Sequence, residues 1–432
     1  MALTEILILL VSFVILLGLG VPIAFSIGIS AMVTMLVNIP AMASFTTLAQ
    51  RMATGLDSFA LLAIPFFILA GQLMNRGGIA TRLIDLAKAM VGRLPGGLAY
   101  VNIMACMLFG AISGSAVAAA SAIGGFMTER MSKEGYPVPF SAAVNITSAT
   151  TGMVIPPSNI LIVYSLASGG VSIAALFLAG YLPGILIGLA LMVVAGIYAY
   201  KKKFPKGDKV GISEFMRSFF KALPSLLLLV IVMGGIIIGV FTATEASAVA
   251  VVYSLILAMV VYKEIKPKDL PGILLSTVGT TAIVMLLIGT SMGMSWVMSF
   301  ENIPQAISAT LLSISENKIV VLIIINLILL FVGTFMDMTP AVLIFTPIFL
   351  PVVTELGVDP IHFGIMMVMN LCLGLCTPPV GGVLFVGCGV ANISISKVLK
   401  PMMPLFIAMF VVLMLVTYIP EIATWLPKFF GF

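Results

Sequence analysis

The sequence predicts an all-α polytopic membrane protein made of two inverted repeats, with about ten crossing helices and two re-entrant helical hairpins. Three observations lead to this fold class. Of the 432 residues, 61% are hydrophobic and only 9% are charged, and the mean hydropathy is +1.25, whereas a soluble domain carries roughly 25% charged residues. One pattern of helix-breaking residues occurs in both halves of the chain, and the basic residues gather in a few loops.

The crossing helices are predicted from apolar stretches, because a helix needs roughly 20 apolar residues to span a bilayer. Glu5 and the absence of a basic residue before the first stretch favour a membrane helix over a signal peptide. Two further stretches, 98–131 and 318–352, are interrupted in the middle and are interpreted as hairpins that do not cross. The predicted crossings are 4–20, 21–38, 57–75, 138–168, 173–200, 221–241, 243–262, 272–298, 361–390 and 401–420.

The distribution of basic residues supports this topology. With the N-terminus outside, 18 of the 21 Lys and Arg residues fall in cytoplasmic loops, as the positive-inside rule requires. The net charge of +5 therefore reflects orientation in the membrane and does not indicate nucleic-acid binding. These loops are 76–97, 130–137, 201–221, 263–270 and 391–400.

A basic cytoplasmic linker at 201–221 divides the chain into its two repeats. Residues 1–200 form the first repeat, whose hairpin 98–131 enters from the cytoplasmic side. Residues 222–432 form the second repeat, whose hairpin 318–352 enters from the periplasmic side. Each repeat contains five crossings, and this odd number inverts the second repeat relative to the first, as in many secondary transporters.

Two apolar segments, NITSATTGMVIPPS at 145–158 and MVMNLCLGLCTPPV at 367–380, break their helices in the same way. Gly152 and Gly374 lie 222 positions apart, and so do Pro156 and Pro378. Proline removes a backbone donor and pushes the preceding residue out of the helical region. In lipid, broken backbone is tolerated only inside protein or around a water-filled cavity. The paired breaks therefore predict a secondary transporter with its site at mid-membrane.

The first hairpin turns at FGAISGSAVAAAS, residues 109–121. A helix that ends there presents free carbonyl groups, which suit Na⁺, and a helix that restarts presents free amides, which suit a carboxylate. The alternative is a tightly packed interface of small residues. Together with the first break, this hairpin predicts a first Na⁺ site formed by Gly110, Ser113, Ser115, Gly152 and Pro156.

The second hairpin turns at VGTFMDMTPAVL, residues 332–343, and places Asp337 within an apolar region. An ionisable residue inside the membrane is costly and indicates a functional site. The alternative is that Asp337 caps the following helix. Hydroxyl and backbone oxygens are suitable ligands for a hard cation. A second Na⁺ site is predicted at Gly333, Thr334, Asp337, Gly374, Thr377 and Pro378.

None of the hairpin turns or breaks contains Lys or Arg, so an anionic substrate would be held by helix N-termini, hydroxyls and nearby cations. No cofactor is expected, and Na⁺ is the expected coupling ion. The predicted substrate-binding residues are Ser113, Ser115, Thr151, Ser158, Asn159, Thr339 and Thr377.

Enzymatic activity is not expected, and no catalytic residue is assigned. A metalloprotease needs a pair of histidines, but His362 is the single histidine. A serine hydrolase needs a Ser–His pair, and His362 is expected near the outer boundary, far from the hairpin serines. The sequence also lacks the GxxxxGK[ST] loop of an ATP-driven transporter. The cysteines are expected to serve packing; they are Cys106, Cys372, Cys376 and Cys388.

Three strings also carry a family resemblance: GLCTPPVG at 374–381, SGSAVA at 113–118 and AIPFFILAGQLM at 63–74. With them, essentially the whole chain resembles the large membrane subunit of tripartite ATP-independent periplasmic (TRAP) transporters. The resemblance implies transport and scaffold domains of the elevator type, in the ion-transporter superfamily. It also implies Na⁺-driven uptake of an organic acid across the bacterial inner membrane by a multi-pass protein.

The same resemblance implies two protein partners, a small four-helix membrane subunit on a separate chain and a periplasmic substrate-binding protein. The overall match favours sialic acid as the substrate, with a C4-dicarboxylate next. The alternative function is a Na⁺/carboxylate symporter of similar architecture that needs no binding protein.

Overall fold

The computed structural model describes residues 2–204, 211–315 and 317–432, and these residues form helices and connections without any β-strand. Part of the predicted basic linker 201–221, at 205–210, lies outside the described residues. The helices of the first repeat are α1 (Ala2–Gly18), α2 (Ile23–Asn38), α3 (Ala41–Leu56), α4 (Ala63–Arg76), α5 (Ile79–Val91), α6 (Gly97–Ser113), α7 (Ala116–Lys133), α8 (Val138–Ala149), α9 (Thr151–Val154), α10 (Asn159–Ala167) and α11 (Ile173–Lys202).

From the hairpins onward, the second repeat reproduces this order with nearly constant spacing. Helices α7, α8 and α11 each begin 222 residues before α17, α18 and α20. The helices of the second repeat are α12 (Ile212–Ile237), α13 (Ala243–Ile256), α14 (Leu270–Phe300), α15 (Ile303–Ile314), α16 (Lys318–Phe335), α17 (Met338–Glu355), α18 (Pro360–Gly374), α19 (Gly382–Ala391), α20 (Ile395–Tyr418) and the terminal α21 (Glu421–Phe429).

Helix length and composition identify eight membrane spans among the described residues, or nine if the bent pair 138–154 and 159–167, with an angle of 51°, counts as one. Helices α1, α2, α18 and α19 are apolar but shorter than a full span. By the same measure α16 and α17 are each long enough to cross. The re-entrant character of 318–352 and the count of ten crossings therefore stay predictions.

Four helices lie outside the predicted crossings and hairpins, namely α3, α5, α15 and α21, and α3 is the longest of them. Helix α3 precedes α4 and is separated from it by a short 3₁₀ turn at Phe59–Leu62. Its sequence carries Gln50 and Arg51, which kept it below the hydropathy of the predicted spans. Together α3 and α4 form an interrupted element that packs along α14.

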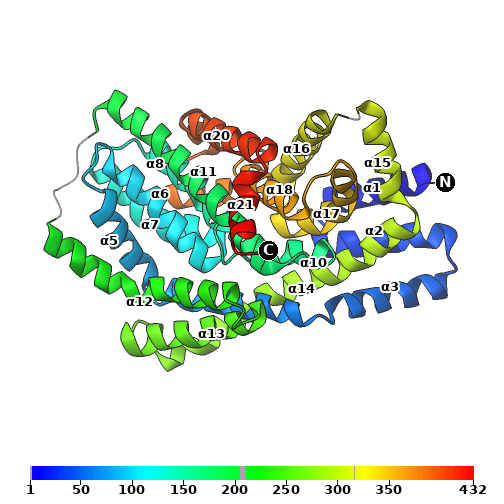
Figure 1. The fold of residues 1–432 in the computed structure, drawn as a ribbon, viewed down its shortest axis with the longest axis horizontal. Helices are drawn as coiled ribbons and strands as arrows, with labels where there is room; N and C mark the ends of the chain where they lie inside the picture. Colours follow the sequence, from blue (N-terminus) through cyan, green and yellow to red (C-terminus); the bar gives the residue numbers. More distant parts are fainter. Residues whose placement is uncertain (1, 205–210, 316) are drawn as a thin grey trace.

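The core lies where the two broken helices meet. Every residue from 140 to 149 in α8 and from 362 to 374 in α18 is buried. In Figure 1, α18 occupies the middle of the molecule, with α6, α7 and α8 on one side and α16 and α17 on the other. The Sγ atom of Cys372 lies 3.4 Å from the carbonyl oxygen of Thr150. Because these residues are 222 positions apart, equivalent points of the two repeats touch each other in the core.

Candidate transport site

The tip of the first hairpin is a two-residue connection between α6 and α7. Gly114 has a φ of 61°, a left-handed conformation that favours glycine. Ser115 is extended, and its hydroxyl accepts a hydrogen bond of 3.2 Å from the N–H of Ala118. Ser115 therefore caps α7, while the first amides of that helix have no intrahelical partner.

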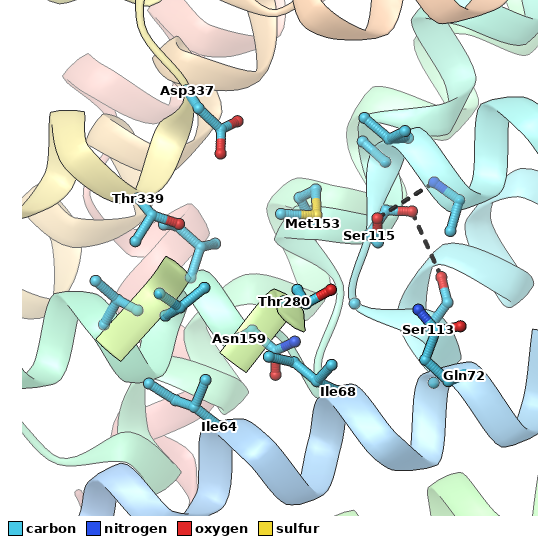
Figure 2. A pocket seen from close by; sticks show the side chains of 18 of the residues that line it. Ile64, Ile68, Gln72, Ser113, Ser115, Met153, Asn159, Thr280, Asp337 and Thr339 are labelled. Carbon is cyan, nitrogen blue, oxygen red and sulfur yellow. Dashed lines mark hydrogen bonds between the residues drawn. The ribbon is translucent and has the colours of Figure 1, made fainter. Parts of the chain in front are cut away.

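The tip of the second hairpin has the same construction. Met336 and Asp337 connect α16 to α17, and Asp337 lies 222 positions after Ser115. Asp337 occupies the N-cap position in an extended conformation, but its carboxylate accepts no capping hydrogen bond. The side chain is accessible and faces the space between the two hairpins (Figure 2). Asp337 thus occupies the N-cap position of α17, but its carboxylate does not accept the capping hydrogen bond.

Each hairpin crosses the broken helix of its own repeat at a pair of glycines. A Cβ atom placed on Gly152 would lie 2.2 Å from the Cα of Gly110. A Cβ atom placed on Gly374 would lie 2.6 Å from the Cα of Gly333. Backbones can approach this closely only when neither residue has a side chain. The glycines thus hold each hairpin directly against the break.

The two breaks themselves are alike. Helix α9 ends at Val154, and α10 begins after the pair Pro156–Pro157, which is joined by a cis peptide bond. Helix α18 ends at Gly374, and α19 begins after the cis pair Pro378–Pro379. The N–H of Gly381, just beyond the second break, donates a hydrogen bond of 3.2 Å to the carbonyl oxygen of Thr334 in hairpin 2. The broken backbone is thereby partly satisfied from within the protein, as lipid burial requires.

A cavity of about 280 Å³ lies between the hairpin tips and the helices α4 and α14 (Figure 2). The N-terminus of α7, the start of α10 and the tip of hairpin 2 form one part of its wall. One face of α4 and one face of α14 form the other part. The polar side chains that line it are Gln72, Asn75, Ser113, Ser115, Asn159, Thr280, Asp337 and Thr339.

A family model described as "Tripartite ATP-independent periplasmic transporter, DctM component" matches residues 10–422. The chain belongs to this family. It is 59% identical to the uncharacterised protein YgiK of Salmonella typhimurium, over 97% of this chain and 96% of that protein. It is 42% identical to the C4-dicarboxylate TRAP transporter large permease DctM of Pseudomonas aeruginosa, over 94% of each chain. It is 39% identical to the sialic acid TRAP transporter large permease SiaM of Vibrio cholerae, over 95% and 96% of the two chains.

The fold is also shared with a solved membrane transporter. The structure superposes on the YdaH transporter of Alcanivorax borkumensis with a TM-score of 0.66, at 12% identity, covering 88% of this chain and 89% of that chain. At that identity the likeness concerns the fold alone. The family membership and the apolar helices establish a multi-pass inner-membrane transport protein and not an enzyme.

The cavity of this TRAP permease includes several residues that the sequence indicated. Both hairpins contribute, although they lie far apart along the chain. The predicted substrate residues that line the cavity are Ser113, Ser115, Asn159 and Thr339, and Asp337 of the predicted second Na⁺ site joins them.

Three predicted substrate residues do not line the cavity, and their assignment as substrate contacts stays a prediction. The hydroxyl of Thr151 donates to the carbonyl of Ser148 at 2.6 Å. The hydroxyl of Thr377 donates to the carbonyl of Leu373 at 2.7 Å. Ser158 donates to the carbonyl of Met153. A hydroxyl next to a helical turn often bonds to that turn, and this local choice directs all three away from the cavity.

The remaining residues of the two predicted Na⁺ sites do not line the cavity. The four glycines form the backbone crossings, and Thr334 donates its hydroxyl to the carbonyl of Phe331 at 2.7 Å. Within the part of the chain that the structure describes, no group of three His, Cys, Asp or Glu side chains could hold a metal ion. A Na⁺ ion at the hairpins would thus rely on backbone and hydroxyl oxygens, with Asp337 as the carboxylate that faces the cavity.

The residues that α4 and α14 contribute to the cavity were not predicted from the sequence. Gln72 and Asn75 lie on the face of α4 that also presents Ile64 and Ile68 to the cavity, and Thr280 comes from α14. The sequence feature that could have indicated Gln72 and Asn75 is a pair of amide side chains, spaced by three residues, at the end of an apolar run. Their helical spacing places them on one face, but which face meets the hairpins depends on packing.

Proposed function

We propose that this permease carries an organic acid across the inner membrane, driven by the inward movement of Na⁺. The observation that carries the proposal is the cavity formed by the two hairpin tips, one from each repeat. The relatives named for C4-dicarboxylates and for sialic acid support an acid as the substrate. Their identities to this chain, 42% and 39%, favour neither acid, so sialic acid and C4-dicarboxylates are both candidates.

The N-terminus of α7 is the proposed site for the carboxylate. Ser115, Ala116 and Val117 line the cavity at the start of this helix, which has 18 residues. A helix N-terminus combines free N–H groups with the positive end of the helix dipole, and it attracts anions. Carboxylate binding there requires no basic side chain, and none lines the cavity in the described part of the chain.

Na⁺ ions are proposed at the two hairpins, in the positions indicated by the sequence. The last turns of α6 and α16 contain Gly110 and Gly333 of the glycine crossings. Their final carbonyl groups have no intrahelical partners, although that of Thr334 accepts a hydrogen bond from Gly381. In its ionised form, Asp337 adds a negative charge at the second hairpin. Bound Na⁺ would offset this charge and so favour the entry of an anionic substrate. The coupling between ion and substrate follows from that electrostatic gain.

An elevator movement is proposed because the cavity lies between two different groups of helices. The hairpins and breaks of both repeats pack together around α8 and α18, whereas α4 and α14 line the opposite wall. Movement of the first group along the second would carry the site across the membrane.

Consistent with the family, a small four-helix membrane subunit and a periplasmic binding protein are the proposed partners.

Uptake by the reconstituted complex tests this function. The permease, its small subunit and the binding protein are placed in proteoliposomes with labelled sialic acid or succinate. We expect uptake with a Na⁺ gradient and none when K⁺ or choline replaces Na⁺. Unchanged uptake without Na⁺ would contradict the coupling, and a persistent proton dependence would make Asp337 the proton carrier. Equal uptake without the binding protein would favour a symporter that works alone.

A further inference from the structure

Three amide side chains project into the cavity without a hydrogen-bond partner in the described structure. Gln72 and Asn75 come from α4, and Asn159 comes from the start of α10. All three are half-buried. By contrast, the hydroxyl of Thr280 on α14 already donates to the carbonyl of Ser276 at 3.1 Å. The three amides and the hydroxyl of Thr339 are therefore among the polar groups of the cavity that remain available to a ligand.

The chemistry of these amides restricts the ligand that satisfies them. Each amide offers two donors and a carbonyl acceptor. A carboxylate only accepts hydrogen bonds, so it can pair with the N–H groups of an amide but not with the amide carbonyl. A hydroxyl both donates and accepts, so it can pair with either end of an amide. Three such amides match a ligand that carries several hydroxyl groups.

The charge of the cavity also favours a ligand with a single carboxylate over one with two. Asp337 is the only charged side chain among the described residues that line it. One carboxylate of a substrate can bind at the N-terminus of α7, but a second carboxylate finds no cationic side chain there. The wall thus suits one negative charge better than two.

Resting on the function proposed above, we infer that the substrate is a polyhydroxylated acid with a single carboxylate and that Gln72, Asn75 and Asn159 determine this specificity. Along α4 the polar residues follow Ile64 and Ile68 on the same face. The hydroxylated part of the substrate lies toward Gln72 and Asn75, and its carbon skeleton packs on the isoleucines. The substrates named for the relatives do not indicate which residues bind them.

Equilibrium binding to the complex of both membrane subunits in nanodiscs, at saturating Na⁺, tests this inference without the selectivity of the binding protein. The ligands are gluconate and N-acetylneuraminate, each with one carboxylate and several hydroxyls, and succinate, with two carboxylates and no hydroxyl. We expect the hydroxylated acids to bind at least tenfold more tightly than succinate. Gln72→Leu, Asn75→Leu and Asn159→Leu should each weaken their binding by about tenfold and change succinate binding by less than twofold.

Gln50→Leu is the matched control, because Gln50 is an exposed amide on α3 outside the cavity, and it should leave all affinities unchanged. Asn75→Gln keeps the amide and should retain most of the selectivity, which separates recognition from misfolding. Succinate binding as tight as that of the hydroxylated acids, or equal losses for all ligands in the variants, would overturn the inference while the proposed function stands. Absence of Na⁺-dependent binding of any acid would overturn both.

Discussion

Ser115 and Asp337 occupy the same position in the two repeats but differ in their chemistry. The serine hydroxyl is already used as a cap for α7, whereas the Asp337 carboxylate faces the cavity without a cap bond. The two repeats thus place a neutral hydroxyl at one hairpin and a carboxyl group at the other. The charged hairpin is the one at which loss of a single side chain should affect ion binding most.

Replacement of Asp337 by Asn tests its role in ion binding. The variant keeps the size of the side chain and removes its charge. We expect the Na⁺ concentration for half-maximal uptake to rise by at least about tenfold, since the loss of ~1.4 kcal/mol weakens binding by that factor. Ser115→Ala should have a smaller effect, because its hydroxyl is engaged by Ala118. Na⁺ titration of uptake in proteoliposomes measures both.

Ser141→Ala is the control for these variants, because Ser141 is buried in α8 and donates only to the carbonyl of Pro137. Its Na⁺ dependence should equal that of the parent. Thr377→Ala distinguishes two places for the second ion. A Na⁺ requirement raised as much as in Asp337→Asn would place that ion beneath hairpin 2, away from the cavity. An unchanged Na⁺ dependence in all four variants would make these residues structural.

At the scale of helices, the glycine crossings explain how the hairpins are held to the breaks. Gly152→Ala should lower the thermal stability of the purified protein, because the new methyl group would overlap the backbone of Gly110. Such overpacking costs about 1–3 kcal/mol. Gly125→Ala in α7 is the control, since nothing lies within 4 Å of its added Cβ. Equal melting temperatures for both variants would show that the crossing adapts without cost.

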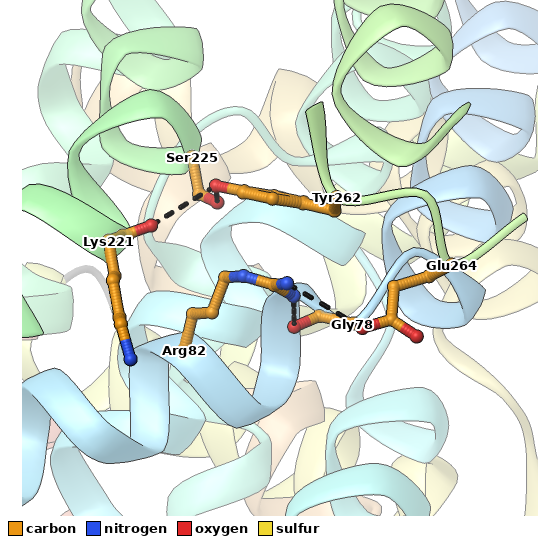
Figure 3. Close-up of polar contacts among 6 residues, drawn as sticks. All are labelled: Gly78, Arg82, Lys221, Ser225, Tyr262 and Glu264. Atoms are coloured by element: carbon orange, nitrogen blue, oxygen red, sulfur yellow. Dashed lines mark hydrogen bonds and ion pairs between the residues drawn. The ribbon is translucent and has the colours of Figure 1, made fainter. Parts of the chain in front are cut away.

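A second helix-level feature joins α5 to the segment after α13 (Figure 3). Arg82 donates a hydrogen bond of 2.7 Å to the carbonyl of Gly78, and its guanidinium lies 3.7 Å from the ring centre of Tyr262. It also lies 3.6 Å from the Glu264 carboxylate, which is half exposed. The hydroxyl of Tyr262 is 2.9 Å from that of Ser225 in α12. Arg82 thus links α5 to the segment after α13, and Tyr262 in turn joins that segment to α12.

The relative weight of these contacts can be measured. Exposed ion pairs contribute little to stability, whereas stacking of a guanidinium on an aromatic ring contributes about 0.5–2 kcal/mol. We therefore expect Tyr262→Leu to lower the melting temperature of the purified protein clearly and Glu264→Gln to change it little. A larger loss from Glu264→Gln than from Tyr262→Leu would make the ion pair the main contact.

At the scale of the whole molecule, the inverted topology is open to a direct test. The labelling positions first suggested by the sequence, 205 and 316, lie outside the described residues. Lys202 and Ser313 are exposed and described. A cysteine in place of Lys202 should react with impermeant thiol reagents only from the cytoplasm. A cysteine in place of Ser313 should react with them only from the periplasm. The native cysteines are all buried and are removed to lower the background. Labelling of both positions from one face would contradict the inversion.

The sequence by itself determined the membrane class, the two repeats and the positions of the hairpin turns and breaks. These features depend on hydropathy, charge distribution, glycine and proline, which act over a few neighbouring residues. Ser115, Asn159, Asp337 and Thr339 could be found in this way because each lies within two residues of such a turn or break.

Only the tertiary structure decided which polar groups face the cavity. Thr151 and Thr377 lie at the breaks, but their hydroxyls bond to their own helices. Gln72 and Asn75 lie in an ordinary apolar helix, but they line the site because α4 packs against hairpin 1 and α14. Whether a side chain bonds to its own helical turn or faces a neighbouring helix depends on contacts between residues far apart in the chain. Those contacts exist only in the folded protein.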